Sequence, residues 1–464
     1  MKNIAIIFIS LILFLPAIAL SETKEIISEG TYNMGDGETP SVAESRALLN
    51  AKQIALEQAG TYVESYTKVE NLQLTKDEIQ VLASGIMEVE ILDKKRTIVG
   101  DGFNFWVKIK AKVNPDKIGE MANKIKLKEK SLVDDYKKIQ EAYEKSQKDI
   151  EELKKQLAQA TGEKKKQVEA KIADDERLFQ ANEWFDKGYE YYLANEYDKA
   201  IEAYTSAIAL NPNHAEAYNN RGVAYDEKGQ YDSAIEDYSR AIVLNPKDAI
   251  AYSNRGNAYK GKGQYDRAIE DYNKAIVLNP KDADAYYNRG LAYDDKNQYD
   301  KAIADFNKAI TLNPKNAGAY NNRGNAYNAK GQHDEAIEDF NKAITLNPKL
   351  VDAYNNRGNA YTDKGQYDRA IEDYNRAIEI NPRLADAYYN RGNAYAVKGQ
   401  YDKAIENFNR AIGINPKHAE AHYNRGKVYY NKGNMGKAIS DFQKACDMGH
   451  ENGCKEAQMV LQER

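Results

Sequence analysis

The carboxyl-terminal part of the chain repeats one pattern of small, apolar and polar positions every 34 residues, in eight units without insertion. In every unit glycine stands at position 8, alanine at positions 20 and 27, and an aromatic residue at position 24. This spacing predicts two amphipathic helices per unit that pack closely together. Proline at position 32 in seven units marks the connection to the next. The units begin at Ala181, Ala215, Ala249, Ala283, Ala317, Val351, Ala385 and Ala419.

The unit closely resembles the tetratricopeptide repeat, and the resemblance covers residues 181–452. It implies a mainly α fold, a tetratricopeptide-repeat superhelix (α-solenoid) whose stacked helix pairs enclose a concave groove. It also implies a function in binding other proteins.

Residues 20–115 mix helical and strand-like patterns and predict a small α+β domain. Thr39-Pro40-Ser41 opens a helix that runs to about Tyr66, and Thr75 to Glu78 have the spacing of a capping box before a second, shorter helix. The last strand alternates apolar and polar residues, as a half-buried hairpin strand does. The expected strands are residues 25–33, 87–99 and 103–113.

Four short motifs in this domain resemble the amino-terminal domain of the flagellar assembly T family and its LPP20-like relatives. They are Glu44-Ser45-Arg46-Ala47, Glu57-Gln58-Ala59-Gly60, Leu74-Thr75-Lys76-Asp77-Glu78-Ile79 and Gly102-Phe103. The resemblance implies an assembly module located in the cell envelope rather than a catalytic domain. The rest of a flagellar assembly T protein has no counterpart in this chain.

Residues 116–180 are rich in charges of both signs and predict a coiled-coil or helical spacer. From Leu132 to Ala160, apolar or small residues alternate at spacings of four and three, which is a heptad seam. Thr161-Gly162 interrupts it. Three arrangements remain open: an antiparallel hairpin that folds at Gly162, a dimeric coiled coil that makes the chain a homo-oligomer, and a solvated charged spacer.

Residues 1–19 have the features of a secretory signal peptide. Lys2 precedes an apolar run from Ile4 to Leu15, and Ala17-Ile18-Ala19 supplies a small-x-small cleavage site. The run is shorter than the roughly 20 residues of a membrane span. After cleavage we expect no membrane span and a periplasmic or secreted protein; retention as an inner-membrane anchor is the alternative.

Charge and motifs exclude several functions. The net charge is −5 and the signs are interspersed, so no basic stripe indicates a nucleic-acid partner. No phosphate loop, nucleophile elbow or metal-spaced cysteine set occurs, so we expect no enzyme, no cofactor and no metal. His418 and His422 invite a zinc interpretation, but they lack the His-Glu-x-x-His order.

Asparagines on one face of the first helices are the candidate binding residues. At about 100° per residue, positions 2, 6, 9 and 13 share a face. An asparagine amide can donate to and accept from one peptide unit, so such a row could hold an extended peptide; it resembles the asparagine ladder in the repeats of O-GlcNAc transferases. A merely solvated row is the alternative. The row comprises Asn220, Asn254, Asn288, Asn322, Asn356, Asn390 and Asn424 at position 6, and Asn257, Asn325, Asn359 and Asn393 at position 9.

Position 7 is arginine in seven units, and position 23 is aspartate in six of the same seven, with Asn407 as the exception. We expect an internal Arg–Asp ladder, because buried charges are costly unless they are paired. A ligand-binding arginine row is the alternative.

The segment from Ala445 through Cys454 resembles the disulfide-tied turns of secreted Sel1-like repeats. The resemblance and the expected oxidising compartment imply a Cys446–Cys454 disulfide that ties the last repeat to a capping helix. Two free thiols are the alternative.

These observations predict a non-enzymatic scaffold or adaptor whose groove binds an extended peptide or a partner protein. A structural, self-assembling envelope component is the alternative. The expected domains are the signal peptide (1–19), the α+β domain (20–115), the spacer (116–180), the eight repeats (181–452) and the capping helix (453–464).

Overall fold

The computed structural model describes residues 23–69, 72, 74–100, 102–127 and 129–462. The predicted signal peptide lies outside these residues. Two compact units make up the chain, Met1–Pro246 and Lys247–Arg464. In the described part of the chain, no helix is long and apolar enough to span a membrane.

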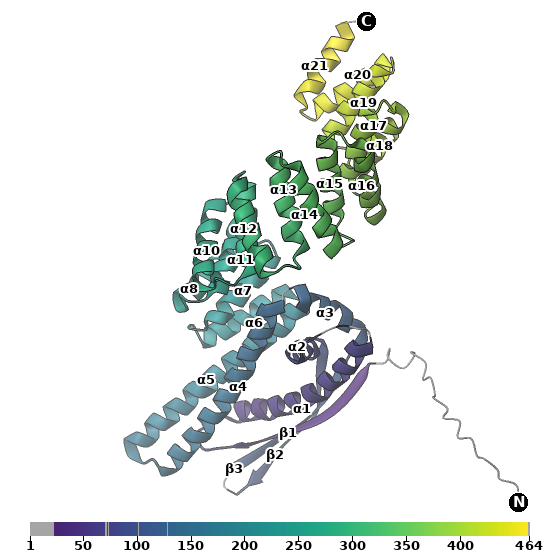
Figure 1. The fold of residues 1–464 in the computed structure, drawn as a ribbon. Helices are drawn as coiled ribbons and strands as arrows, with labels where there is room; N and C mark the ends of the chain where they lie inside the picture. The colour runs from purple at the N-terminus through teal and green to yellow at the C-terminus, as the bar shows by residue number, and fades with distance from the viewer. Residues whose placement is uncertain (1–22, 70–71, 73, 101, 128, 463–464) are drawn as a thin grey trace, which may run out of the picture. The chain divides into compact units, whose positions relative to one another are not determined.

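The first unit begins with a three-stranded antiparallel sheet in the order β1-β3-β2, with helix α1 packed along one face (Figure 1). Strand β3 alternates as its sequence predicts, and its buried residues, such as Val107 and Ile109, face the core. Thr75 and Glu78 form the predicted capping box at the start of α2. The elements are β1 (Lys24–Met34), α1 (Pro40–Val69), α2 (Lys76–Ile86), β2 (Met87–Val99), β3 (Gly102–Val113), a 3₁₀ turn (Pro115–Lys117) and α3 (Ile118–Leu127).

Helices α4 (Glu129–Gln159) and α5 (Gly162–Leu193) form an antiparallel hairpin that folds at Gly162, whose φ is 55° (Figure 1). Of the three arrangements that the sequence left open, this is the hairpin. The seam is buried inside one chain, where Ile150 packs against Ile172, so the segment is not a solvated spacer. Helix α5 continues without a break from the hairpin into the first repeat, and the expected boundary at residue 180 falls inside it.

A buried polar cluster fastens the hairpin to α1. Arg46 is fully buried; its guanidinium lies 2.7 Å from the Asp175 carboxylate and 3.1 Å from the Ser146 hydroxyl, and it stacks over Phe179 at 4.3 Å. Glu38 lies 3.9 Å from the same guanidinium. A buried arginine with carboxylate and aromatic partners holds sheet domain and hairpin in one core.

The repeats fold as the expected helix pairs, with the first helix of repeat 1 supplied by α5 (Figure 1). The remaining helices of the first unit are α6 (Tyr197–Leu210), α7 (Ala215–Glu227) and α8 (Tyr231–Leu244). Those of the second unit are α9 (Ala249–Gly261), α10 (Tyr265–Leu278), α11 (Ala283–Asp295), α12 (Tyr299–Leu312), α13 (Ala317–Ala329), α14 (His333–Leu346), α15 (Val351–Asp363), α16 (Tyr367–Ile380), α17 (Ala385–Val397), α18 (Tyr401–Ile414), α19 (Ala419–Asn431), α20 (Met435–Asp447) and α21 (Glu451–Gln462).

Glycine at position 8 allows the two helices of a repeat to touch. A Cβ atom on Gly324 would lie 2.8 Å from a ring carbon of Phe340, the aromatic residue at position 24. The buried alanines at positions 20 and 27 complete the contact. The pattern that defined the repeat in the sequence is therefore its packing pattern.

Candidate functional site

The candidate site is a face of the first helices of repeats 3–8, all of which belong to the second unit. The first helices of successive repeats (α9, α11, α13, α15, α17 and α19) contact one another, whereas second helices mainly contact first helices. The array therefore curves with its first helices on the inside. We call positions 2, 5, 6, 9, 12 and 13 of these helices the inner face.

The position-6 asparagines brace neighbouring repeats. In repeats 5–8 the amide nitrogen donates to the position-5 side chain of the preceding repeat: Asn322 to the Tyr287 hydroxyl at 2.8 Å, and Asn356 to the Asn321 oxygen at 3.3 Å. Asn390 and Asn424 do the same, to Asn355 at 3.2 Å and to Tyr389 at 2.9 Å. The row is half-buried and built into the array, which neither the ladder nor the solvated alternative anticipates.

These hydrogen bonds use the amide N–H donors of the asparagines and leave amide oxygens without a partner. The amide oxygens of Asn356, Asn390 and Asn424 accept no hydrogen bond from any residue that the structure describes. Asn288 makes no side-chain hydrogen bond within the described residues, and the Ser253 hydroxyl at position 5 of the preceding repeat is buried without a partner. The inner face thus carries amide oxygens that no described residue uses.

The position-9 asparagines divide into three kinds. Asn257 and Asn359 accept a hydrogen bond from the position-24 tyrosine of their own repeat, at 2.7 and 2.8 Å. Asn393 accepts one from Asn424 at 3.0 Å. Asn325 has no hydrogen-bond partner among the described residues. In the first unit, Asn220 is buried and accepts a bond from Asn219 at 3.1 Å.

The predicted Arg–Asp ladder is confirmed, and it lies within each repeat. In repeat 5, Arg323 donates from Nε and Nη2 to the two carboxylate oxygens of Asp339, at 2.7 and 2.5 Å. Its third nitrogen donates to Asn307 of the preceding repeat. All three guanidinium nitrogens are engaged in these bonds, which disfavours the alternative of a ligand-binding arginine row. The other pairs are Arg221–Asp237, Arg255–Asp271, Arg289–Asp305, Arg357–Asp373 and Arg425–Asp441.

Burial governs the ionisation of this ladder. It raises the pKa of Asp339, and the hydrogen bonds from Arg323 oppose that rise only in part. The same bonds raise the pKa of Arg323. In repeat 7 the partner is Asn407, so burial lowers the pKa of Arg391.

A second ladder links successive repeats on the exposed surface. The lysine at position 14 of one repeat pairs with the aspartate at position 18 of the repeat before it, as Lys330 does with Asp300. The further pairs are Lys228–Asp198, Lys296–Asp266, Lys364–Asp334, Lys398–Asp368 and Lys432–Asp402. Position-18 carboxylates are therefore already neutralised.

In the first repeat, the chain's own amino-terminal domain covers the equivalent face. Position 9 is Tyr189 and position 13 is Leu193, and both are buried in the core shared with the sheet domain. Leu193 packs against Gly85 of α2, where an added Cβ would lie 2.9 Å from its Cδ1 atom. The inner face open to a ligand therefore begins beyond the first repeat.

Position 6 of the first repeat is Asp186 in place of asparagine. Burial, together with the nearby charge of Glu190, raises its pKa to about 7. Lys52 of α1 lies 3.6 Å from Glu190, and Tyr143 of α4 hydrogen-bonds to Asp186. The repeat pattern does not predict this contact, although the aspartate in place of asparagine at position 6 is a visible signal.

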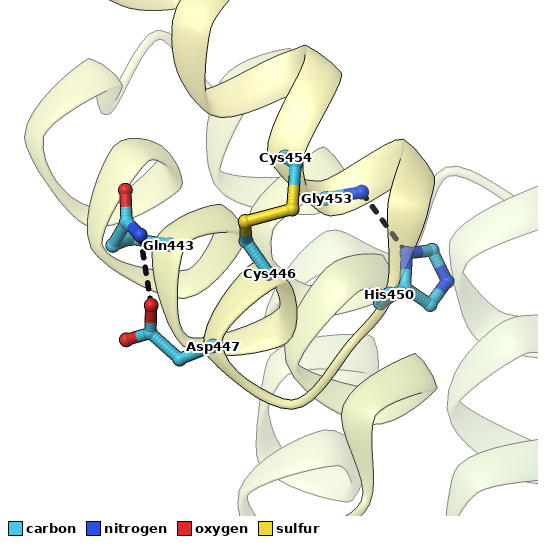
Figure 2. Close-up of a disulfide and its surroundings, with 6 residues drawn as sticks. All are labelled: Gln443, Cys446, Asp447, His450, Gly453 and Cys454. Atoms are coloured by element: carbon cyan, nitrogen blue, oxygen red, sulfur yellow. Dashed lines mark hydrogen bonds between the residues drawn. A yellow bond between two sulfur atoms is a disulfide. The ribbon is translucent and has the colours of Figure 1, made fainter.

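A disulfide between Cys446 and Cys454 joins α20 to α21, with their Cα atoms 4.6 Å apart (Figure 2). His450, which replaces the usual proline, accepts a hydrogen bond from the Gly453 amide at 3.0 Å and stacks on Tyr423. Ala457 and Val460 of α21 are buried against the last repeat. The helix begins at Glu451, two residues before the expected start of the capping segment.

The two histidines of the rejected zinc motif have separate surroundings. His422 is buried at a packing position, with Nδ1 3.6 Å from Asp441. His418 caps α19 and lies between two carboxylates, Nε2 3.6 Å from Asp386 and Nδ1 3.3 Å from Glu420. Among the described residues no group of three or more potential ligands could hold a metal ion.

Comparison with protein families identifies the repeat array. Three tetratricopeptide repeat models together match residues 188–452, more than half of the chain. The model described as TPR repeat matches residues 188–228, 225–263, 256–296, 324–362, 358–399 and 392–433. Of the two models described as tetratricopeptide repeat, one matches residues 283–316 and 419–452, and the other matches residues 306–338. The chain is a helical-repeat protein and belongs to the tetratricopeptide repeat family.

Among solved structures, the MamA protein is 35% identical over 37% of this chain and 93% of its own, with a TM-score of 0.34. YrrB, described as a tetratricopeptide repeat protein with an unusual peptide-binding site, is 32% identical over 40% of this chain and 96% of its own, with a TM-score of 0.35. A tetratricopeptide repeat protein from Parabacteroides merdae is 24% identical over 51% and 94%, with a TM-score of 0.44. No curated protein matches the chain.

Proposed function

We propose that this chain is a non-enzymatic scaffold that binds an extended segment of a partner protein on the inner face of its repeats, outside the cytoplasm. Membership of the tetratricopeptide repeat family supports protein binding. The observation that carries the proposal is the row of position-6 asparagines along the inner face, in which the amide oxygens of Asn356, Asn390 and Asn424 are unused. Acceptors repeated along a groove can bond peptide N–H groups at regular intervals along an extended chain.

The proposed location rests on the amino-terminal sequence. A basic residue, an apolar run and a small-x-small site are typical of export. The Cys446–Cys454 disulfide agrees with an oxidising compartment. Within this proposal the amino-terminal domain, which resembles envelope assembly modules, docks the scaffold to another envelope component.

The alternative of self-assembly through residues 116–180 has less support. The heptad seam already packs within one chain, with Ile139, Tyr143 and Ile150 buried. A dimer through the same seam would first have to open the α4–α5 hairpin. Light scattering of the mature chain tests this alternative, and a stable dimer that Ile150→Asp converts to monomer would favour it.

A crosslinking experiment tests the receptor role. A photo-crosslinking amino acid in place of Asn325 on the inner face should capture a partner from envelope extracts, because the Asn325 side chain makes no hydrogen bond to another described residue. The matched control places it at Lys342, which is exposed on the second helix of the same repeat. Equal capture from both positions would contradict an inner-face site.

Replacing Asn288, Asn322 and Asn356 together by alanine should weaken that capture. The variant also loses two braces, at about 0.5–1.5 kcal/mol each, so capture is compared well below its melting temperature. Alanine at the exposed Lys274, Lys308 and Lys342 is the control. Undiminished capture by the asparagine variant would count against the row.

A further inference from the structure

The inner face of repeats 3–8 carries acidic residues in addition to amide oxygens. Position 2 is acidic in four of these repeats, and position 13 in two. Lys260 and Lys427 are the only cationic residues at positions 2, 6, 9, 12 and 13 of the same repeats. The acidic side chains are exposed: Asp284, Asp352, Asp386 and Glu420 at position 2, and Asp295 and Asp363 at position 13.

These six carboxylates differ from the repeated aspartates at positions 18 and 23. The aspartates at positions 18 and 23 pair with lysine and arginine, as Asp300 and Asp339 do. Within the described residues, none of the six lies within ion-pair distance of a lysine or arginine. Asp386 and Glu420 lie beside the His418 ring, and Asp363 accepts a hydrogen bond from the Asn328 amide at 3.1 Å, so the partners of these carboxylates include no lysine or arginine.

His418 presents an unpaired donor at this end of the row, because its Nδ1 atom already accepts the Ala421 N–H. Its side chain is only 10% exposed and lies between Asp386 and Glu420, with its ring tilted against that of Tyr389 at 4.7 Å. Its buried Nε2 atom has no hydrogen-bond partner, since the Asp386 oxygen is 3.6 Å away. The nearby amide nitrogen of Asn424 already donates to the Tyr389 hydroxyl and to the Asn393 oxygen. This end of the array also carries the unused amide oxygens of Asn390 and Asn424 and the carboxylates of Asp386 and Glu420, so its acceptors exceed its donors.

The spacing of the row matches an extended chain. Asp352, Asp386 and Glu420 occupy the same position of three successive repeats. Packed helices lie about 8–10 Å apart, and an extended chain rises by about 3.3 Å per residue. One repeat therefore corresponds to about three residues of ligand.

We propose that the inner face of repeats 6–8 binds an extended, cationic protein segment with lysine or arginine at about every third residue. The carboxylates of Asp352, Asp386 and Glu420 bind the side-chain charges, and the amide oxygens of Asn356, Asn390 and Asn424 accept backbone N–H bonds. This assignment rests on the proposed function, and it adds the chemistry of the partner.

The test is a titration of the full mature chain with labelled synthetic peptides, followed by fluorescence anisotropy. One peptide has lysine at every third position between neutral polar residues, one has the same lysines in a contiguous block, and one has glutamate in their place. The spaced lysine peptide should bind best, and its affinity should fall as salt is raised. Equal affinity for the lysine and glutamate peptides would overturn the assignment.

A matched pair of triple variants separates the inner face from net charge. Asp352→Asn, Asp386→Asn and Glu420→Gln together should weaken binding of the spaced peptide about tenfold. The control neutralises three exposed carboxylates on second helices, Glu338→Gln, Glu372→Gln and Glu406→Gln, and should change affinity by less than about twofold. Equal losses in both variants would reduce the effect to non-specific attraction and overturn the proposal.

The two proposals fail in different ways. If a neutral or acidic peptide binds and depends on the asparagine row, the scaffold function stands and the cationic assignment is wrong. If no peptide binds and crosslinking from Asn325 captures no partner, both are wrong.

Discussion

At position 7 an arginine such as Arg323 is held by a bidentate bond to its own repeat and a third bond to the repeat before it. This side chain therefore stabilises both the helix pair and the stacking of pairs. Half-buried charges of this kind are costly when one partner is removed, because the other stays buried without compensation. Repeat 7 is the natural exception, with Arg391 bonded to the neutral Asn407.

Asn407→Asp should therefore raise the stability of the array, by about 1 kcal/mol, because it supplies the missing carboxylate. The converse change in the neighbouring repeat, Asp373→Asn, should lower it, because Arg357 loses its charged partner. Thermal unfolding of the two variants beside the parent chain provides the measurement. A lower melting temperature for Asn407→Asp would contradict this account of position 7.

At the scale of the element, the last helix is stable because it is attached. Helix α21 buries Ala457 and Val460 against the final repeat, and the disulfide ties it to α20. Short helices are marginal in isolation, so covalent attachment and packing supply what propensity does not. The disulfide acts on the end of the array, where no further repeat covers the apolar surface.

Replacing Cys446 and Cys454 by serine should loosen α21 and leave the repeats intact. A disulfide closing so short a loop contributes roughly 2–3 kcal/mol. Hydrogen–deuterium exchange should quicken in α21 and the end of α20, with α9 to α14 unchanged as the internal control. Unaltered exchange in α21 would show that packing alone holds the helix.

The elements themselves follow closely from the sequence. Gly324 and Phe340 pack as their period requires, and Thr75 and Glu78 form the cap that their spacing predicts. The α4–α5 hairpin could not be chosen over a dimer, because a heptad seam buries equally well within one chain or between two. The donors of the asparagine row were also unpredictable, since their partners stand 35 residues away on a neighbouring helix.

At the scale of the whole molecule, the amino-terminal domain is continuous with the repeat array. Helix α5 belongs to both, and Tyr189 and Leu193 share the core of the sheet domain. The domain covers the face of the first repeat that is the counterpart of the inner face. That face of the first repeat is therefore closed, and a continuous helix, in place of a flexible linker, joins the domain to the first repeat.

The contact between this domain and the first repeat should depend on pH. Burial and the charge of Glu190 raise the pKa of Asp186 to about 7, above its unfolded value near 3.8. The folded state therefore binds the Asp186 proton more tightly than the unfolded state does. The contribution of Asp186 to the free energy of unfolding is full below about pH 4 and is lost as the pH rises towards 7. Lys52 remains charged throughout, because nearby carboxylates raise its pKa despite burial.

Asp186→Asn should remove that part of the pH dependence, because the amide has no proton to release. Trp184 lies two residues away on α5, so its fluorescence, with Trp106 replaced by phenylalanine, reports unfolding of this region. Denaturation of the parent should show stability falling between pH 4 and pH 7 more steeply than that of the variant. Parallel profiles would place the titrating group elsewhere, whereas convergence at low pH would identify Asp186 as the buried acid that joins α5 to α1 and α4.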